Sequence, residues 1–255
     1  MSDILERIVA DKRARLAKGE YGRRKPSDRP TDGAAFLAAL REPGIRIIGE
    51  IKAKSPSAGE ILPGADGRIE SYALHYRRGR AAAISVVTEE DHFGGRPDWL
   101  PRAKSISGLP ILMKDFFVDE LQLDFAVDLG ADAVLLIVRV LTDGELSALA
   151  RGARERGLAA VVEVHDADDI ARAGAVSPEV LGVNARDLTT FQTDFAVLEN
   201  LAGAITDGPV RLAESAIRTR ADIDRLSKSG YRAFLVGEAL LRSEEPEDDL
   251  RALHG

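Results

Sequence analysis

Apolar residues occur along most of this chain in short continuous runs, separated by stretches that have one apolar and one polar face. A continuous apolar run rich in Val, Ile and Ala is typical of a strand buried on both faces. Such runs occupy eight segments: 47–51, 83–87, 111–113, 133–138, 159–164, 180–183, 210–213 and 233–236. Helical periodicity between them is clearest over 120–129, 143–156, 166–172 and 221–229.

Strands that alternate with helices predict a parallel sheet in an α/β protein. Eight such units in a chain of this length favour a single closed (β/α)8 TIM barrel over an open doubly wound sheet. The first strand is not followed by Gly-x-Gly-x-x-Gly, which argues against a dinucleotide-binding fold. The catalytic barrel is expected to span residues 46–255.

An N-terminal helical extension is expected before the barrel, over residues 1–45. Residues 2–19 predict an amphipathic helix with apolar residues on one face and Lys12 among the charged residues of the other. Glycines end this helix, and a loop rich in Pro, Gly and Asp is expected over 20–33. A short helix over 34–41 leads to the first strand.

The composition is that of a soluble metabolic protein. Of 255 residues, 45% are hydrophobic and 30% charged, and the net charge of −7 argues against a nucleic-acid surface. The chain has no cysteine, which excludes disulfides and thiolate nucleophiles. The histidines lack metal-ligand spacing, so no metal is expected, and most of them are predicted to lie on the surface or in loops: His75, His92, His165 and His254. The charged N-terminus and the absence of an apolar run of about 18 residues predict a cytoplasmic protein without membrane contact.

Polar side chains follow the predicted strands at the ends that open into loops. Glu50 and Lys52 lie two residues apart at the end of the first strand, so both side chains point to the same face. The carboxyl ends of the strands of a barrel meet around one pocket, where active sites are built. The other candidates for this pocket are Ser55, Lys114, Glu163, Asn184, Arg186 and Glu214. Lysines, carboxylates and an amide around one pocket predict an acid–base site without a metal.

Most of these residues have an alternative interpretation, and Asn184 and Arg186 would also suit a turn and the rim of the barrel. Glu50 and Lys52 would also suit a surface ion pair on an edge strand, and Lys114 would suit a lysine that reaches for solvent. Glu163 would instead pair with an arginine outside the barrel. Their joint occurrence with similar residues at seven strand ends favours the active site.

Two further features indicate a phosphorylated ligand that carries a flat ring. Ser215 follows the seventh strand and Gly237 the eighth, and small residues there leave backbone N–H groups available where barrels bind phosphate. Phe93 and Phe116 lie at loop entrances, where a ring-shaped substrate would need walls.

The motifs at these strand ends resemble the indole-3-glycerol phosphate synthase family. The matching segments are EIKAKSPS (50–57), SVVTEEDHFGG (85–95), ILMKDF (111–116), VEVHD (162–166), GVNARDL (182–188), AES (213–215) and VGEAL (236–240). Their order and spacing hold along essentially the whole chain. The KSPS and MKDF segments together are the most specific to this family.

The resemblance implies a cofactor-free carbon–carbon lyase of tryptophan biosynthesis. Its substrate, 1-(2-carboxyphenylamino)-1-deoxyribulose 5-phosphate, closes to an indole with loss of carbon dioxide and water. By the matching positions, Lys114 is expected to give a proton to the ribulose carbonyl oxygen, Lys52 to pair with the substrate carboxylate and Glu163 to act as the base. The division of acid duty between the two lysines stays open. Glu50 and Asn184 are expected to orient the intermediate.

The resemblance also implies residues that bind the substrate. The ring walls would be Phe93, Phe116 and Leu188, the phosphate would contact Ser215, Ala216, Gly237 and Glu238, and Ser55, Arg186 and Glu214 complete the set. The chain departs from the usual family pattern at Ala216, where glycine is usual, and at Ala185, where many members have asparagine. If residue 216 has a positive φ, alanine costs about 1 kcal/mol, which affects phosphate affinity more than the chemistry.

Two other classes of function stay open at this stage. One is a different phosphate-binding barrel lyase, such as an aldolase that forms a Schiff base on Lys114. The other is a non-catalytic paralogue, against which the retained Lys52, Lys114 and Glu163 argue. A monomer is expected, and association with other enzymes of tryptophan biosynthesis is left open.

Overall fold

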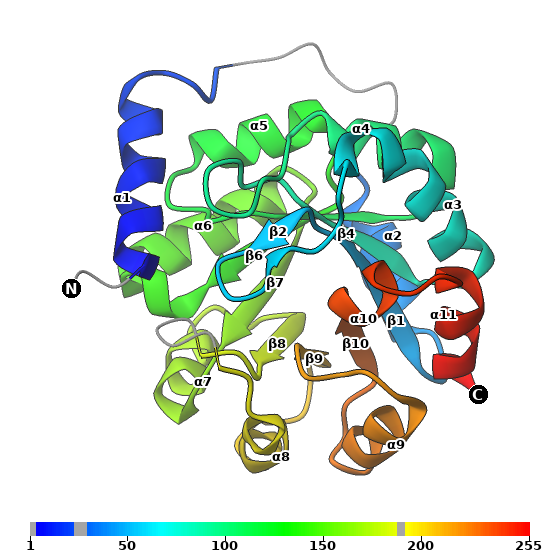
Figure 1. Cartoon of the computed structure of the whole chain (residues 1–255). Coiled ribbons are helices and arrows are strands. Elements are labelled where there is room, and N and C mark those ends of the chain that lie inside the picture. Colours follow the sequence, from blue (N-terminus) through cyan, green and yellow to red (C-terminus); the bar gives the residue numbers. More distant parts are fainter. Residues whose placement is uncertain (1–3, 23–29, 188–191) are drawn as a thin grey trace.

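Eight parallel strands close into a barrel in the order β1-β10-β9-β8-β7-β6-β5-β4, and helices surround them (Figure 1). This computed structural model describes residues 4–22, 30–187 and 192–255. The barrel strands are β1 (Arg46–Ile51), β4 (Ala83–Val87), β5 (Ile111–Lys114), β6 (Ala133–Ile137), β7 (Ala159–Val164), β8 (Val180–Asn184), β9 (Val210–Glu214) and β10 (Ala233–Val236). The predicted (β/α)8 barrel is confirmed.

The helices around the barrel follow the strands in turn. They are α3 (Ile69–Arg78), α4 (Trp99–Ser107), α5 (Leu121–Leu129), α6 (Asp143–Glu155), α7 (Ala167–Gly174), α8 (Phe195–Ala202), α9 (Arg220–Lys228), α10 (Glu238–Leu241) and α11 (Pro246–His254). Two of them begin with capping boxes, in which Thr142 and Thr219 accept a hydrogen bond from the backbone N–H three residues later. Left-handed glycines end α4 and α5, at Gly108 and Gly130.

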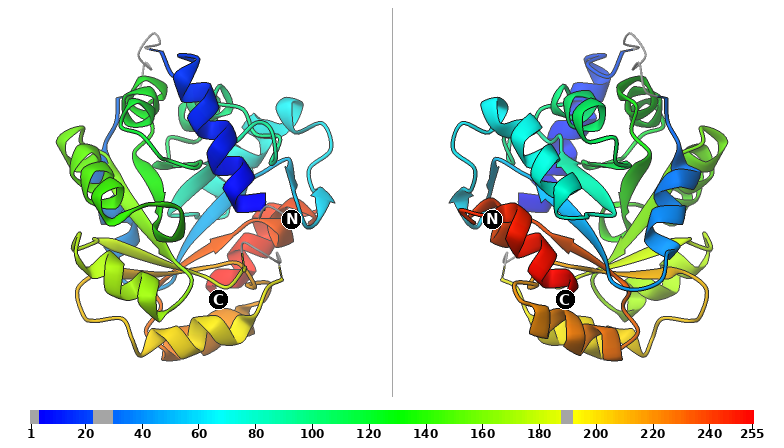
Figure 2. Two further views of the ribbon diagram at one scale, coloured as in Figure 1. Left: turned by 90° about the vertical axis from the view of Figure 1, so that its left-hand side faces the viewer. Right: turned by 90° about the vertical axis from the view of Figure 1, so that its right-hand side faces the viewer.

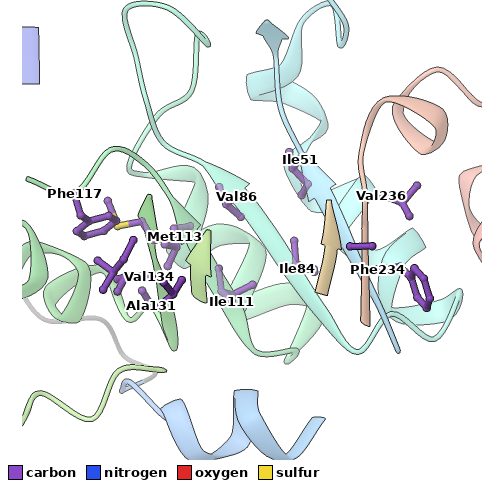
Figure 3. Close-up of a cluster of buried hydrophobic side chains, with 14 of the residues drawn as sticks. Ile51, Ile84, Val86, Ile111, Met113, Phe117, Ala131, Val134, Phe234 and Val236 are labelled. Atoms are coloured by element: carbon purple, nitrogen blue, oxygen red, sulfur yellow. The ribbon is translucent and has the colours of Figure 1, made fainter. Parts of the chain in front are cut away.

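Strand alternation divides the core into two clusters. Outward-facing strand residues pack beneath the helices, and Figure 3 shows part of this outer cluster, with Ile84, Met113 and Val134 among its members. Inward-facing residues of the same strands fill the barrel, including Ile48, Leu112, Leu135, Val161 and Leu212. Side chains alternate along a strand, so the inward-facing residue that follows an inner-cluster member lies closer to the carboxyl end of the barrel. We call this open end the mouth.

The inward positions at the mouth carry the polar residues of the strand ends. Four of them lie two residues beyond an inner-cluster member of the same strand: Glu50, Lys114, Glu163 and Glu214. Asn184 lies four residues beyond Val180 on β8, and the corresponding residue of β6, Ile137, is apolar. The apolar interior and the polar mouth therefore follow from one alternating pattern on each strand.

Two helices that precede β1 pack against opposite ends of the barrel. Helix α2 (Gly33–Arg41) adds Phe36 and Leu40 to the inner cluster, and the Gly33 N–H donates to Gly157 O, two residues before β7. A Cβ at position 33 would lie 2.5 Å from the backbone of β7, so only glycine permits this approach. The side views place α2 and the β2–β3 hairpin (Lys54–Ser55 and Gly59–Glu60) at opposite ends of the barrel (Figure 2).

Helix α1 (Ile4–Ala17) packs near the carboxyl ends of the strands, and one of its residues corrects the sequence prediction. Lys12, predicted on the polar face, is 2% exposed, and its Nζ lies 2.7 Å from Asp115 Oδ1, just after β5. Leu5 and Ile8 join the inner cluster. The buried face of α1 therefore includes the Lys12 ammonium, which forms an ion pair with Asp115 of the barrel.

Other differences from the sequence prediction are small. The hairpin of β2 and β3 was not predicted, and Val138 belongs to a 3-10 turn, η2 (Val138–Val140), in place of the end of β6. A second such turn, η1 (Ala65–Arg68), precedes α3. Residues 2 and 3 of the first predicted helix and 23–29 of the predicted loop lie outside the described ranges. None of the helices in the described ranges is long and apolar enough to cross a bilayer.

Candidate active site

A pocket of about 450 Å³ opens at the carboxyl ends of the strands, and it contains most of the predicted site. The predicted residues that line it are Glu50, Lys52, Ser55, Phe93, Lys114, Phe116, Glu163, Asn184, Arg186, Ser215, Ala216, Gly237 and Glu238. Glu214 is completely buried and lies beside the pocket wall, where it contacts Lys114. Leu188 lies outside the described residues.

Lys114 lies between two carboxylates. Its Nζ is 2.8 Å from Glu214 Oε2 and 3.2 Å from Glu50 Oε2. Burial disfavours the charged form, but Glu214, Glu50 and Glu163 together raise the pKa of Lys114 well above its usual value. The ammonium therefore stays protonated, which suits a proton donor and opposes Schiff-base formation, since that reaction needs a neutral amine.

Glu50 connects the two lysines of the site. Its Oε1 accepts a hydrogen bond of 2.5 Å from Lys52 Nζ. Burial alone would raise the pKa of Glu50, yet Lys52 and Lys114 lower it to about 2, so the carboxylate is ionised at any physiological pH. A Cβ at position 237 would lie 2.6 Å from Glu50 Oε1, so Gly237 leaves room for this carboxylate. Gly237, predicted from the sequence to serve the phosphate, thus also shapes the acid–base site.

The pKa of Glu214 is shifted in the opposite direction from that of Glu50. Glu214 is fully buried, and burial together with Glu163 and Glu50 raises its pKa to about 7, against the opposing effect of Lys114. A Cβ at position 182 would lie 2.4 Å from Glu214 Oε1, so Gly182 makes space for this side chain on the neighbouring strand β8. Glu214 therefore binds a proton more tightly than an ordinary glutamate, while its Oε2 holds Lys114 in place.

Glu163 points from β7 into the pocket and remains ionised. Burial would raise its pKa, but His165 and Lys114 lower it, with help from the Asn184 side chain. The Asn184 Oδ1 accepts hydrogen bonds from Ser215 Oγ (2.8 Å) and from the Arg186 N–H (3.0 Å). These two donors fix the carbonyl side of the amide, which directs the NH2 group toward Glu163.

Most of the histidines are predicted to lie on the surface or in loops, and His165 does lie in the loop after β7 but is buried there. Its side chain is 3% exposed, and its Nε2 lies 3.3 Å from Glu163 Oε1. The signal was present in the sequence, because His165 follows Glu163 by two residues, the spacing that puts both on one side of an extended chain.

The loops after β9 and β10 form the other end of the pocket. Ser215 and Ala216 have φ values of 67° and 60°, in the left-handed region that favours glycine. Arg218 and Arg242 also line this end, and neither was predicted from the sequence. Arg242 Nε donates to Glu238 Oε1 at 3.0 Å. The sequence did contain a signal for these two residues, because an arginine that closely follows a small residue at a strand end is suited to bind an anion.

Two phenylalanines form the aromatic part of the wall. The ring centroids of Phe93 and Phe116 lie 6.1 Å apart, with planes inclined by 39°. The Glu89 carboxylate accepts backbone hydrogen bonds from residues 91, 92 and 93, which fixes the loop that carries Phe93. Ala185, the second departure from the family pattern, is buried and does not line the pocket.

The family model for indole-3-glycerol phosphate synthase matches residues 5–253 of the chain. A Streptomyces coelicolor protein named indole-3-glycerol phosphate synthase 2 is 41% identical, and the alignment covers all of both chains. An indole-3-glycerol phosphate synthase of Rhizorhabdus wittichii is also 41% identical, over 99% of this chain and 97% of the relative.

Solved structures of lower identity share the fold. Orotidine 5'-phosphate decarboxylase from Pyrococcus horikoshii superposes with a TM-score of 0.62 at 16% identity, over 82% of this chain and 97% of that one. A 3-hexulose-6-phosphate synthase from Salmonella typhimurium gives a TM-score of 0.65 at 14% identity, with the same coverage. At such identities the likeness supports the barrel fold alone.

Proposed function

The chain belongs to the indole-3-glycerol phosphate synthase family, a carboxy-lyase family of tryptophan biosynthesis, and from this premise we propose how the barrel mouth divides the chemistry. The substrate is 1-(2-carboxyphenylamino)-1-deoxyribulose 5-phosphate. The reaction joins the ring carbon that carries the carboxylate to the ribulose carbonyl carbon, then releases carbon dioxide and water. Because the carboxylate leaves as a neutral gas, each turnover takes up one proton.

Lys114 is the proton donor in ring closure. The new carbon–carbon bond places negative charge on the former carbonyl oxygen, and a charged ammonium can donate to that oxygen. The observation that supports this role is the position of Lys114 between Glu50 and Glu214, which keeps its ammonium protonated inside the pocket. Glu214, which titrates near neutral pH, is placed to return a proton to Lys114 after each turnover.

Lys52 binds the substrate carboxylate until it leaves as carbon dioxide. Its side chain is 15% exposed and extends from the end of β1 toward the pocket opening, beside Glu50. A cation there stabilises the carboxylate in the bound substrate without needing to move during the reaction. Glu50 holds both lysines at fixed positions.

Glu163 is the base of the dehydration step. Once the carboxylate has left, the aromatic indole forms when a proton is removed from the bicyclic intermediate and its hydroxyl departs as water. An ionised carboxylate in the pocket accepts that proton. Asn184 orients this carboxylate and is itself held by Ser215.

The two ends of the pocket match the two ends of the substrate. Phe93 and Phe116 contact the anthranilate ring on one side. The backbone near Ser215 and Ala216 binds the phosphate on the other, assisted by Arg218 and Arg242. The remaining pocket residues predicted to contact the substrate are Ser55, Arg186, Gly237 and Glu238.

The test of this proposal is direct turnover of the ribulose phosphate substrate. Purified protein should produce indole fluorescence together with one carbon dioxide per product. Borohydride added during turnover should leave the protein mass unchanged, because no imine to Lys114 forms. A substrate-derived adduct on Lys114 would replace this assignment with the aldolase chemistry that the sequence left open.

Three expectations go with this function. We expect a monomer in the cytoplasm, and association with other enzymes of tryptophan biosynthesis stays open. We also treat residues 1–45 as an extension that precedes the catalytic barrel.

A further inference from the structure

His165 is a buried imidazole that the proposed chemistry does not yet use. It lies one residue beyond the end of β7, and its Nε2 is 3.3 Å from the Glu163 carboxylate. The separation is that of an ion pair, because the alignment is poor for a hydrogen bond. At this distance His165 acts on Glu163 both as a close polar neighbour and through its charge.

A second carboxylate lies on the other side of the same ring. His165 Nδ1 is 3.7 Å from Asp169 Oδ2, in the first turn of α7. That oxygen also accepts the backbone N–H of His165, at 3.1 Å. Asp169 is held in turn by Arg139, whose Nε lies 3.7 Å away and whose Nη2 donates to Asp166 at 2.7 Å. The imidazole thus lies between two carboxylates that come from different elements.

The balance of charges around the ring favours its protonated form. Burial and Arg139 of η2 lower the pKa of His165, while Asp169 of α7 and Glu163 of β7 raise it, and the result is about 9. At neutral pH the ring is therefore an imidazolium.

The effect of the imidazolium on a neighbouring carboxylate follows from a comparison of two buried glutamates, Glu163 and Glu214. Glu163 and Glu214 are both completely buried, and both interact with Lys114. Yet the pKa of Glu214 is raised to about 7, whereas the pKa of Glu163 is lowered. The largest effect that lowers the pKa of Glu163 comes from His165, and Glu214 has no such neighbour among the groups that shift its pKa.

We propose that His165 is a positioning residue of the indole-forming reaction, which lies between Asp169 and Glu163 and keeps the Glu163 carboxylate ionised for proton removal. The inference rests on the proposed role of Glu163 as the base. His165 does not line the pocket, so it acts through Glu163 and not on the substrate.

The first test observes the ring directly and needs no turnover. In ¹⁵N-histidine NMR spectra of the whole protein at about pH 7.5, both ring nitrogens of His165 should carry protons, as they do not in a free imidazole. Single Gln variants of His75, His92 and His254 assign the other rings, so the assignment holds even if a variant at position 165 fails to fold. A neutral His165 ring at this pH would overturn the proposal.

The second test is the pH dependence of turnover in His165→Gln. Without the cation, the pKa of Glu163 rises, so the acid limb of the kcat profile should move up by about one pH unit, with KM nearly unchanged. The matched control is His75→Gln, whose side chain is 37% exposed and which should keep the wild-type profile. A folded His165→Gln protein whose kcat falls equally at every pH, or whose KM alone changes, would contradict the proposal.

The variant Glu163→Gln tests the role of Glu163 separately from the charge of His165. If it retains activity, Glu163 is not the base and the proposed function of that residue fails. The NMR result on His165 still reports the charge of the ring, because it does not depend on which residue removes the proton.

Discussion

Ala216 lies just after β9 with φ at 60°, where a side chain forces a strained backbone. Glycine at this position would relieve about 1–2 kcal/mol of strain and cost about 0.5–1 kcal/mol in conformational entropy, so Ala216→Gly should be slightly more stable than the wild type. Without a Cβ the backbone could also approach the phosphate of the proposed substrate more closely. We expect a higher Tm and tighter phosphate binding by calorimetric titration.

Ala239→Gly is the matched control for this change. Ala239 lines the same pocket but lies within α10, where alanine is unstrained. Glycine there should destabilise the protein by about 0.5–1 kcal/mol. If both variants lose stability equally, the left-handed backbone at position 216 carries no strain.

Replacement of Glu163 by glutamine retains the shape and polarity of the side chain but removes its ability to accept a proton. We expect kcat to fall by about 10²–10⁴-fold with little change in KM, since the amide still fills the pocket. Steady-state kinetics by indole fluorescence measure both constants. An increase in KM with kcat intact would make Glu163 a binding residue and require another base.

The site residues that could be predicted from the sequence are those marked by a local pattern, a polar side chain that directly follows an apolar run. Lys114 and Glu163 follow apolar runs, so their place at the mouth could be predicted from alternation alone. The charge state of each carboxylate could not be predicted, because it depends on residues from other strands. Glu50 and Glu214 have the same side chain, yet the first has its pKa lowered by two lysines and the second has it raised by burial.

Helix α1 is attached to the barrel by a buried ion pair. Lys12→Met should cost about 3 kcal/mol in free energy of unfolding, because it leaves Asp115 buried without its cation, although Thr88 Oγ1 and the Phe116 N–H still donate to it. Urea denaturation measures this cost. The double variant Lys12→Met with Asp115→Asn should recover a large part of it, since no unpaired charge then remains.

The double-mutant cycle decides whether Lys12 and Asp115 act as a pair. Additive losses in the two single variants would show that they stabilise the protein independently. Lys18→Met, on an exposed residue beyond the end of the same helix, is the matched control and should change stability by less than about 0.5 kcal/mol.

The elements themselves were largely predictable, and the exceptions have physical reasons. Each barrel strand is a continuous apolar run, which is a strong local signal. The hairpin of β2 and β3 has two residues in each strand, too few for any periodicity to appear. Lys12 was assigned to the wrong face because it is charged, although its spacing from Leu5 and Ile8 puts it on the buried side of α1.

At the scale of the whole molecule, inward-facing residues of many strands place several ionisable groups close together in one buried site. This arrangement makes stability depend on pH. The pKa of Glu214 rises from 4.5 to about 7 on folding, so its contribution to stability is fully present below pH 4.5 and is lost as the pH rises through 7. The expected loss from this group is about 3 kcal/mol, from 1.36 kcal/mol for each unit of pKa shift.

Glu214→Gln tests this pH dependence. Its free energy of unfolding should be less sensitive to pH between 4.5 and 7 than that of the wild type, because the amide does not titrate. Denaturant unfolding at a series of pH values gives the two slopes. Equal slopes in this window would show that Glu214 titrates near its ordinary value.

The barrel as a whole could be predicted from eight strand–helix units and the chain length. The position of α1 near the carboxyl ends of the strands could not. The packing of α1 near the carboxyl ends depends on contacts between residues about 100 positions apart, such as Lys12 with Asp115, for which a single sequence gives no signal. The same limit applies to Arg218 and Arg242, which reach the pocket only because the last strands bring them there.

The measurement that tests the account most directly is kcat for Lys114→Ala, with Lys228→Ala as the matched control on an exposed helix position. We expect the control to be unchanged, and Lys114→Ala to remain folded but to lose about 10²–10⁴-fold in kcat, because it lacks the ammonium that Glu50 and Glu214 hold in the pocket. A folded Lys114→Ala protein that retains more than about a tenth of the wild-type kcat would contradict the central role of Lys114.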